Sequence, residues 1–162
     1  MPGTTYFLEM FAAPVRTIPP PREGLSTVHA VRPTVAYYRF LYETVGRDYG
    51  WTSRKKMSDS DLKSILQDPL NEVHVLMVNG SPGGFVELDR RKEWEIEITQ
   101  FGLMGEHIGQ GLGKYFLHWA LHRAWSCQPK RVWLHTCTND HAHALVNYRK
   151  AGLQIYQETP RA

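Results

Sequence analysis

Hydrophobic and polar positions divide the chain into short segments of two kinds. In seven segments the alternation and the flanking turn residues favour a strand; they cover residues 5–10, 25–31, 72–80, 83–91, 93–104, 131–138 and 153–159. In four others apolar residues recur every three or four positions, as on one face of a helix; they cover residues 32–51, 58–69, 112–126 and 141–152. The alternation at 5–10 is the weakest, so we expect six strands with a seventh at the N-terminus.

The order of these elements indicates the fold class. From residue 25 onward it is β-α-α-β-β-β-α-β-α-β, and the three central strands are joined by "NGSPGG" and a charged turn, which favours an antiparallel meander. We expect an α/β fold with a mixed sheet. Residues 1–24 form an N-terminal strand and a proline-rich connector, and residues 25–162 form a single domain.

The amino-acid composition limits the classes of binding partner and the cellular compartment that we expect. The 162 residues are 42% hydrophobic and 22% charged, with a net charge of +3, and no run of Lys and Arg exceeds three residues. These values argue against disorder and against a nucleic-acid partner. Two cysteines without CxxC spacing predict reduced thiols. Since there is neither a leader nor an apolar run of about 18 residues, we expect a cytoplasmic protein without a membrane partner.

A glycine cluster precedes the helix predicted at 112–126. The segment "GEHIGQGLGKYFL" places four glycines within nine residues, at 105, 109, 111 and 113. A strand, a glycine turn and a helix N-terminus expose unpaired amides that suit an anion such as phosphate. A P-loop is excluded because Tyr115 follows Lys114, and a dinucleotide motif is excluded because Lys114 stands at its last glycine position. A simple turn explains the glycines without a ligand.

A family resemblance covers this region. "FGLMGEHIGQGLGKYFLHWAL" resembles the acyl-CoA-binding motif of the GCN5-related N-acetyltransferase (GNAT) superfamily. Phe101 and Leu103 match the end of its strand, and Gly111 and Gly113 match its two small residues. Ile108 stands where the family usually has Gln or Arg. "NYRKAGL" is similar to the family's "LYEKLGF", and the order of elements matches from residue 25 to 156.

The resemblance implies a fold and a cosubstrate. The fold is a GNAT-like acyl-CoA N-acyltransferase fold, with a mixed, mostly antiparallel sheet of six to seven strands and about four flanking helices. The cosubstrate is acetyl-CoA (coenzyme A), and no metal is implied. We expect weaker binding because of Ile108, with compensation by Gln110 and Lys114. The residues expected to bind the cosubstrate are Phe101, Leu103, Ile108, Gly109, Gln110, Gly111, Leu112, Gly113, Lys114, Asn139 and Tyr148.

Two residues are candidates for catalysis. Tyr148 aligns with the family tyrosine that donates to the coenzyme A sulfur, and Glu97 aligns with the glutamate base of the histone acetyltransferases in the superfamily. The alternatives are a core tyrosine and a solvated strand face. The family asparagine that usually stands seven residues before the tyrosine is His141 here, and Asn139 lies two residues too early. The resemblance also places the Leu103 amide at the thioester carbonyl, beside a strand bulge.

The sequence gives weaker evidence for the residues that would bind the amine acceptor. Tyr49, Trp51 and Arg54 lie on the connection between the first two predicted helices, which by resemblance forms one wall of that site. An arginine beside aromatic rings suits an acceptor that carries a carboxylate; packing at a helix end is the alternative. The acceptor is a small-molecule amine or a protein amine, and both a monomer and a homodimer stay open.

Five histidines in the second half of the chain are candidate metal ligands. His118 and His122 share one helix face, and His135, His141 and His143 flank a strand-to-helix turn. A solvated helix face and an ordinary turn explain them without a metal, and we expect none.

The function expected from these observations is an acetyl-CoA-dependent N-acetyltransferase. It transfers an acetyl group to a primary amine by direct attack within a ternary complex. The alternatives are a non-catalytic acyl-CoA-binding sensor on the same fold and an unrelated phosphate-binding α/β domain. Because the family commonly has a further strand after the last one expected here, we expect residues 5–10 to add to the edge of the sheet, or to a partner's sheet, in its place.

Overall fold

The computed structural model describes residues 3–161. Its strands are β1 (Thr4–Met10), β2 (Leu25–His29), β3 (Asn71–Val78), β4 (Ser81–Asp89), β5 (Glu95–Leu103), β6 (Arg131–Cys137) and β7 (Gln154–Pro160). Its α-helices are α1 (Val35–Gly46), α2 (Asp59–Leu66), α3 (Leu112–Ser126) and α4 (Ala144–Lys150). Ten of the eleven lie within the segments expected from the hydrophobic pattern or within one residue of them, and β4 begins two residues before its expected segment. Single 3₁₀ turns occur at Arg47–Tyr49 and Gly105–His107.

The strands form one mixed sheet. Within the described residues its order is β2-β3-β4-β5-β6-β1-β7, and every neighbouring pair is antiparallel except β5 and β6, which run parallel. The expected meander is therefore confirmed as β3-β4-β5. The parallel pair arises because α3 connects β5 to β6 and returns the chain to the same end of the sheet.

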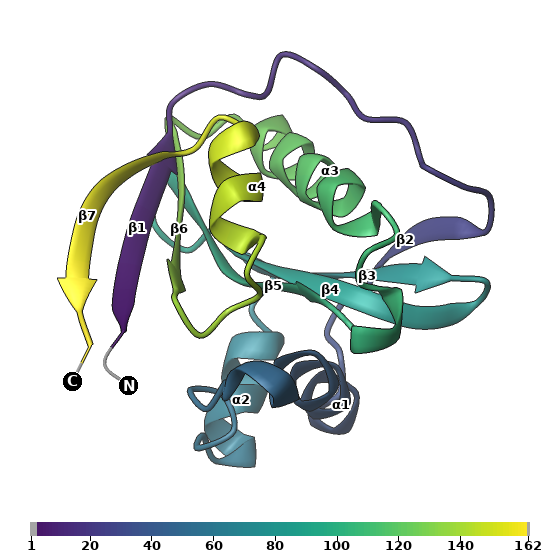
Figure 1. Ribbon diagram of the computed structural model, residues 1–162. Coiled ribbons are helices and arrows are strands. Elements are labelled where there is room, and N and C mark those ends of the chain that lie inside the picture. Colours follow the sequence, from purple (N-terminus) through teal and green to yellow (C-terminus); the bar gives the residue numbers. More distant parts are fainter. Residues whose placement is uncertain (1–2, 162) are drawn as a thin grey trace.

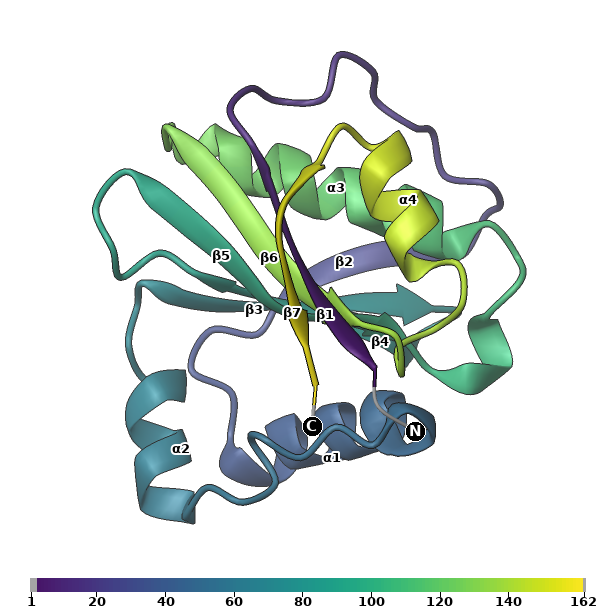
Figure 2. The ribbon, with the colours of Figure 1, turned by 60° about the vertical axis from the view of Figure 1, so that its left-hand side comes forward.

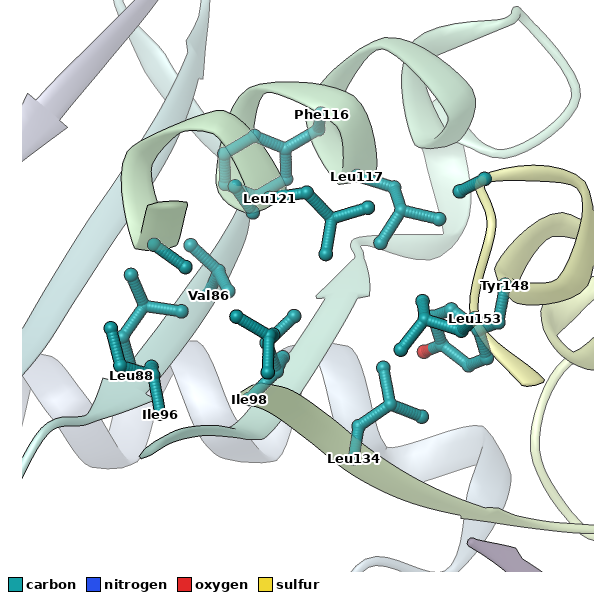
Figure 3. Packing of buried hydrophobic residues seen from close by; sticks show 14 of the residues in the cluster. Val86, Leu88, Ile96, Ile98, Phe116, Leu117, Leu121, Leu134, Tyr148 and Leu153 are labelled. Atoms are coloured by element: carbon teal, nitrogen blue, oxygen red, sulfur yellow. The ribbon is translucent and has the colours of Figure 1, made fainter. Parts of the chain in front are cut away.

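Helices cover both faces of the sheet. Figures 1 and 2 show α1 and α2 on one face and α3 and α4 on the other. Each face has its own core. The core under α3 and α4 is mainly aliphatic, and Figure 3 labels Val86, Leu88, Ile96, Ile98, Phe116, Leu117, Leu121, Leu134, Tyr148 and Leu153 in it. The core under α1 and α2 is richer in aromatic rings and includes Tyr38, Tyr42, Phe85, Leu41, Val45, Leu62 and Leu66.

The N-terminal strand lies in the interior of the sheet and not at its edge. β1 pairs with β6 on one side, where Leu8 faces Leu134, and with β7 on the other, where Leu8 faces Ile155. Leu8 is fully buried. This corrects the expectation of an edge strand: α4 carries the chain past one strand position, and β1 fills that position, which leaves β7 outermost.

Strand β5 separates from β6 halfway along its length. The two strands pair only from Glu95–Arg131 to Glu97–Trp133. Just beyond, the pairing with β4 shifts, since Leu88 faces Ile98 but Glu87 faces Gln100, so one extra residue of β5 forms a bulge. The bulge and the divergence open the middle of the sheet, as the resemblance implied.

The helix N-termini differ in how their amides are satisfied. Thr34 caps α1 and Ser58 caps α2, each through a side-chain oxygen that accepts a backbone N–H bond. The N-cap of α3 is Gly111, which has no side chain to do so. Amides at the start of α3 are therefore left for another acceptor. Among residues 3–161 there is no helix with the length and apolar character needed to cross a membrane.

Candidate active site

A cavity of about 780 Å³ opens where β5 and β6 diverge. Its walls come from both faces of the sheet. From the α3/α4 side they include Ile108, Gly109, Gly111, Gly113, Lys114, Leu117, Asn147 and Tyr148. From the α1/α2 side and the β6–α4 loop they include Tyr42, Tyr49, Trp51, Ser53, His135, Asn139, Asp140 and His141. Between these walls run the ends of β5 and β6.

The glycine loop forms the α3 end of the cavity. Gly109 and Gly111 have φ angles of 84° and 78°, which L side chains rarely adopt. These angles turn the chain so that α3 begins directly at the cavity. Gly113 lies against Leu103, since an added Cβ would be 3.6 Å from the Leu103 Cδ1 atom. A loop of this shape presents backbone N–H groups and the positive end of the helix dipole to a ligand.

Not every residue expected to bind the cosubstrate faces the cavity. Leu112 is fully buried in the core, and the side chain of Gln110 instead bonds Arg22 and the carbonyl oxygen of Glu106. Phe101, Leu103, Ile108, Gly109, Gly111, Gly113, Lys114, Asn139 and Tyr148 all line the cavity. Their contact with a cosubstrate stays a prediction.

The end of β5 forms the floor where the two halves of the cavity meet. The ring of Phe101 stacks on Phe116 at 5.5 Å and meets Tyr148 edge-on at 6.2 Å. Gly102 faces α1, where an added Cβ would lie 2.5 Å from the Val45 Cγ1 atom. The glycine at this position is therefore required by the close approach of α1.

Tyr148 stands between the core and the cavity. Only 8% of the residue is exposed, and in Figure 3 its ring lies beside Leu134 and Leu153. Burial raises its pKa well above the ordinary value, and the carboxylate of Asp140 raises the pKa further. The phenol therefore keeps its proton near neutral pH and is a hydrogen-bond donor. Core packing and a role in the cavity do not exclude each other here.

Asp140 is a cavity residue that sequence reasoning did not identify. Its Oδ2 accepts bonds from the Thr136 hydroxyl at 2.6 Å and the Cys137 amide at 3.0 Å, and its Oδ1 accepts a bond from Trp51 Nε1 at 3.1 Å. The carboxylate thus ties the loop after β6 to the segment after α1. An acidic residue three positions after a strand was the only signal, and its partner Trp51 is 89 residues away.

His135 is a second such residue. It was weighed only as a metal ligand or a turn residue, yet it lies on β6 facing the α1/α2 side and lines the cavity. Its ring is exposed to the cavity and lies 5.6 Å from that of Phe7. Desolvation by the surrounding protein lowers its pKa, although Asp140 opposes the shift. The imidazole is therefore neutral at pH 7 and able to accept a proton.

The expected acceptor residues divide into two groups. Tyr49 and Trp51 line the cavity, and the Trp51 ring is 5.5 Å from that of Tyr42. Arg54 does not line it: its Nη2 atom donates to Glu87 at 2.8 Å, and only 13% of its side chain is exposed. The guanidinium thus satisfies an internal carboxylate, which argues against the carboxylate-bearing acceptor that this arginine suggested.

The partner of Arg54 is the centre of a buried polar network. Glu87 on β4 is fully buried. Besides Arg54, the Tyr38 hydroxyl and the Asn71 amide donate to its carboxylate. Since the network joins α1, β3, β4 and the segment after α1, it holds the α1/α2 layer on the sheet.

Glu97 lies close to this network but outside the cavity lining. Its neighbours Ile96 and Ile98 belong to the core on the α3/α4 side, so Glu97 points to the α1/α2 side. Burial and the nearby carboxylate of Asp89 raise the pKa of Glu97 to about 7. A carboxyl that titrates near neutrality is suited to exchange protons. Because Glu97 does not line the cavity, a water molecule would have to carry the proton between it and a reacting group.

One cluster away from the cavity has metal-ligand chemistry. Within residues 3–161, His29, Glu72 and His74 bring potential ligand atoms within 4.8 Å of one another. However, Arg90 and Arg123 donate to both carboxylate oxygens of Glu72 at 2.8–3.0 Å. Two guanidinium charges on one carboxylate oppose a further cation, so the cluster serves as an ion-pair network.

Comparisons with known proteins bear on this geometry. Residues 38–153 match the acetyltransferase (GNAT) family. None of the curated proteins matches the chain. Among solved structures, a GCN5-related N-acetyltransferase from Sphaerobacter thermophilus is similar, with 18% identity and a TM-score of 0.67 over 96% of this chain and 49% of that one.

Two further solved structures are similar over most of their own length. An aminoglycoside acetyltransferase from an uncultured soil metagenomic sample, in complex with sisomicin, has 13% identity and a TM-score of 0.64 over 80% of this chain and 88% of that one. An IAA acetyltransferase from Bacillus cereus has 18% identity and a TM-score of 0.62 over 82% and 79%.

The chain spans about half of the Sphaerobacter protein's length and 50–63% of the length of four other similar solved structures. These likenesses show the fold, and the family match covers most of the chain, including the glycine loop and Tyr148. The chain belongs to the acetyltransferase (GNAT) family, whose members typically use acetyl-CoA.

Proposed function

We propose that the protein is an acetyl-CoA-dependent N-acetyltransferase that acetylates a primary amine by direct attack within a ternary complex. The observation that carries the proposal is one continuous cavity of about 780 Å³ with walls from both faces of the sheet. One wall offers backbone amides and Lys114 to an anionic ligand, and the other offers aromatic rings and polar side chains. Two substrates that enter from opposite faces would meet at the end of β5.

The reaction places a defined demand on each wall. The amine nitrogen forms a bond to the thioester carbonyl carbon, the carbon–sulfur bond breaks, and the amine loses a proton while the thiolate gains one. Backbone donors at the end of β5, the Leu103 amide among them, would stabilise charge on the carbonyl oxygen. Tyr148 would donate a hydrogen bond to the leaving sulfur, a role that fits its raised pKa and its place in the cavity wall.

Two groups are candidates to accept the amine proton. Glu97 has a pKa of about 7 and would act through a water, since it does not line the cavity. His135 lines the cavity directly, and its lowered pKa keeps it in the basic form. The Asp140 carboxylate faces the same space and would attract a cationic amine before that amine is deprotonated.

Titration calorimetry and a thiol-release assay test the proposal together. We expect the protein to bind acetyl-CoA at micromolar concentration and to release coenzyme A when a suitable amine is added. The amines tested are amino acids, polyamines, an aminoglycoside and a lysine peptide. Binding without thiol release for any acceptor would support the non-catalytic acyl-CoA sensor instead. Absence of binding, or tighter binding of a nucleotide than of coenzyme A, would overturn the assignment.

A further inference from the structure

The connector between β1 and β2, residues 11–24, runs along α3 toward the glycine loop. Figures 1 and 2 show it passing over the helical layer before it reaches β2. His122 on α3 fixes its first half, because the Nε2–H group donates to the carbonyl oxygen of Arg16 at 2.9 Å. Its second half reaches the cavity, where an added Cβ on Gly111 would be 3.8 Å from the Cβ atom of Pro21. The proline-rich sequence stiffens this path.

The route brings Arg22 to the loop. Its Nη1 atom donates to the Oε1 atom of Gln110 at 3.1 Å, and the Nε2 atom of Gln110 donates to the Glu106 carbonyl oxygen at 3.2 Å. Arg22 is exposed, and a guanidinium has five N–H donors, of which Gln110 occupies one. The rest of the fork is available to a ligand held by the loop.

Arg22 brings a positive charge to a glycine loop whose own side chains offer few groups that can bind phosphate. Ile108 provides no charge or donor, although it lines the cavity. Lys114 contributes one positive charge from the first turn of α3, whereas Glu23 and Glu106 contribute negative charge nearby. Of these groups, only Arg22 offers a planar fork that matches two phosphate oxygens at once.

We propose that Arg22, delivered by the N-terminal connector, binds the phosphates of the acyl-CoA held at the glycine loop and replaces the basic or amide side chain that Ile108 does not provide. The inference rests on the proposed function, because it assumes that acyl-CoA occupies the cavity. It also gives the connector, which the reaction itself does not require, a part in binding the cosubstrate.

Binding by the Arg22→Ala variant tests the inference. We expect its dissociation constant for acetyl-CoA, followed by protein NMR, to rise about three- to tenfold. The dissociation constant for S-acetylpantetheine, which carries no phosphate, should stay within twofold. The acetyl-CoA effect should shrink as salt is raised, because an exposed charge interaction is screened. Arg16→Ala is the matched control, since Arg16 lies on the same connector but contacts α3 through its backbone.

A second variant guards against a merely structural effect. In the Arg22→Ala background, Ile108→Arg should recover most of the lost affinity for acetyl-CoA. Equal losses for both ligands, or no loss at all, would overturn the role of Arg22 while leaving acyl-CoA binding intact. Failure of the wild-type protein to bind either ligand would instead refute the proposed function and the inference with it.

Discussion

On the α3/α4 face the cavity is shaped by backbone: glycines at left-handed φ angles bring the uncapped N-terminus of α3 to its wall. On the α1/α2 face it is shaped by side chains, through the Trp51–Asp140 bond and the network around Glu87. A wall formed by backbone groups is specified by nearby residues in the sequence, through the spacing of small residues. A side-chain site depends on partners that are far apart in the sequence, so the two walls respond differently to substitution.

The largest effect should come from the side-chain wall. Glu87→Ala removes the one acceptor shared by Tyr38, Arg54 and Asn71 and leaves a buried guanidinium unpaired. We expect the free energy of unfolding to fall by about 3–5 kcal/mol, measured by urea denaturation. Glu9→Ala is the control, because Glu9 pairs with Arg131 in an ion pair that is still partly exposed to solvent, and its loss should cost about 1 kcal/mol or less. Similar losses in the two variants would show that the Glu87 network does not organise this wall.

The second effect concerns the junction of the two walls. Tyr148→Phe removes the phenolic donor but keeps the ring that meets Phe101. Turnover should fall about 100-fold, with little change in KM for acetyl-CoA, in steady-state thiol release. Since the pKa of Tyr148 is raised, the wild-type profile should show no loss of activity from this group below about pH 10. Tyr115→Phe, a control on the neighbouring helix α3, should leave turnover unchanged; unchanged turnover in Tyr148→Phe would remove Tyr148 from the mechanism.

The third effect isolates the backbone wall. Gly109 and Gly80 both have φ angles of 84°, and an added Cβ meets nothing within 4 Å at either position. Alanine should therefore lower stability by about 1 kcal/mol in each case. Only Gly109→Ala should also weaken acetyl-CoA binding, by about tenfold, because it disturbs the loop at the start of α3. Calorimetry on both variants checks this, and an equal effect of Gly80→Ala on binding would contradict it.

The smallest effect is a pH-dependent change in stability on the side-chain wall. The folded-state pKa of Glu97, about 7, lies above the unfolded value. Its protonated form therefore favours folding below about pH 4.5, and that contribution is lost as the pH rises through 7. Glu97→Gln should thus stabilise the protein at pH 8, by about 1 kcal/mol, and change little at pH 5. Thermal unfolding at both pH values measures this, and a shift of equal size at both would exclude the titration.

The same variant bears on the choice of base. If Glu97 accepts the amine proton, the rise in rate near pH 7 should disappear in Glu97→Gln and remain in His135→Gln. Because the pKa of His135 is lowered from 6.5, a rise in rate below pH 6.5 that disappears only in His135→Gln would instead assign the proton to His135, which lines the cavity directly.

The sequence by itself determined the elements and the backbone wall. Period-two alternation placed the strands, helical spacing placed α1 to α4, and the glycines of residues 105–113 marked the loop, because each of these signals lies within about ten consecutive residues. Tyr148 was singled out as a candidate for the same reason, through the resemblance of the local stretch "NYRKAG" to the family; its catalytic role stays a prediction.

Only the tertiary structure decided the position of β1 and the composition of the other wall. The alternation in residues 4–10 is compatible with an edge or an interior strand, and pairing with β6 and β7 settles which. Likewise, the polarity of Arg54 does not reveal that Glu87 neutralises it, and nothing near Asp140 in the sequence indicates Trp51 as its partner. Long-range pairing and burial set the ionisation and direction of these side chains, and neither is encoded in local spacing.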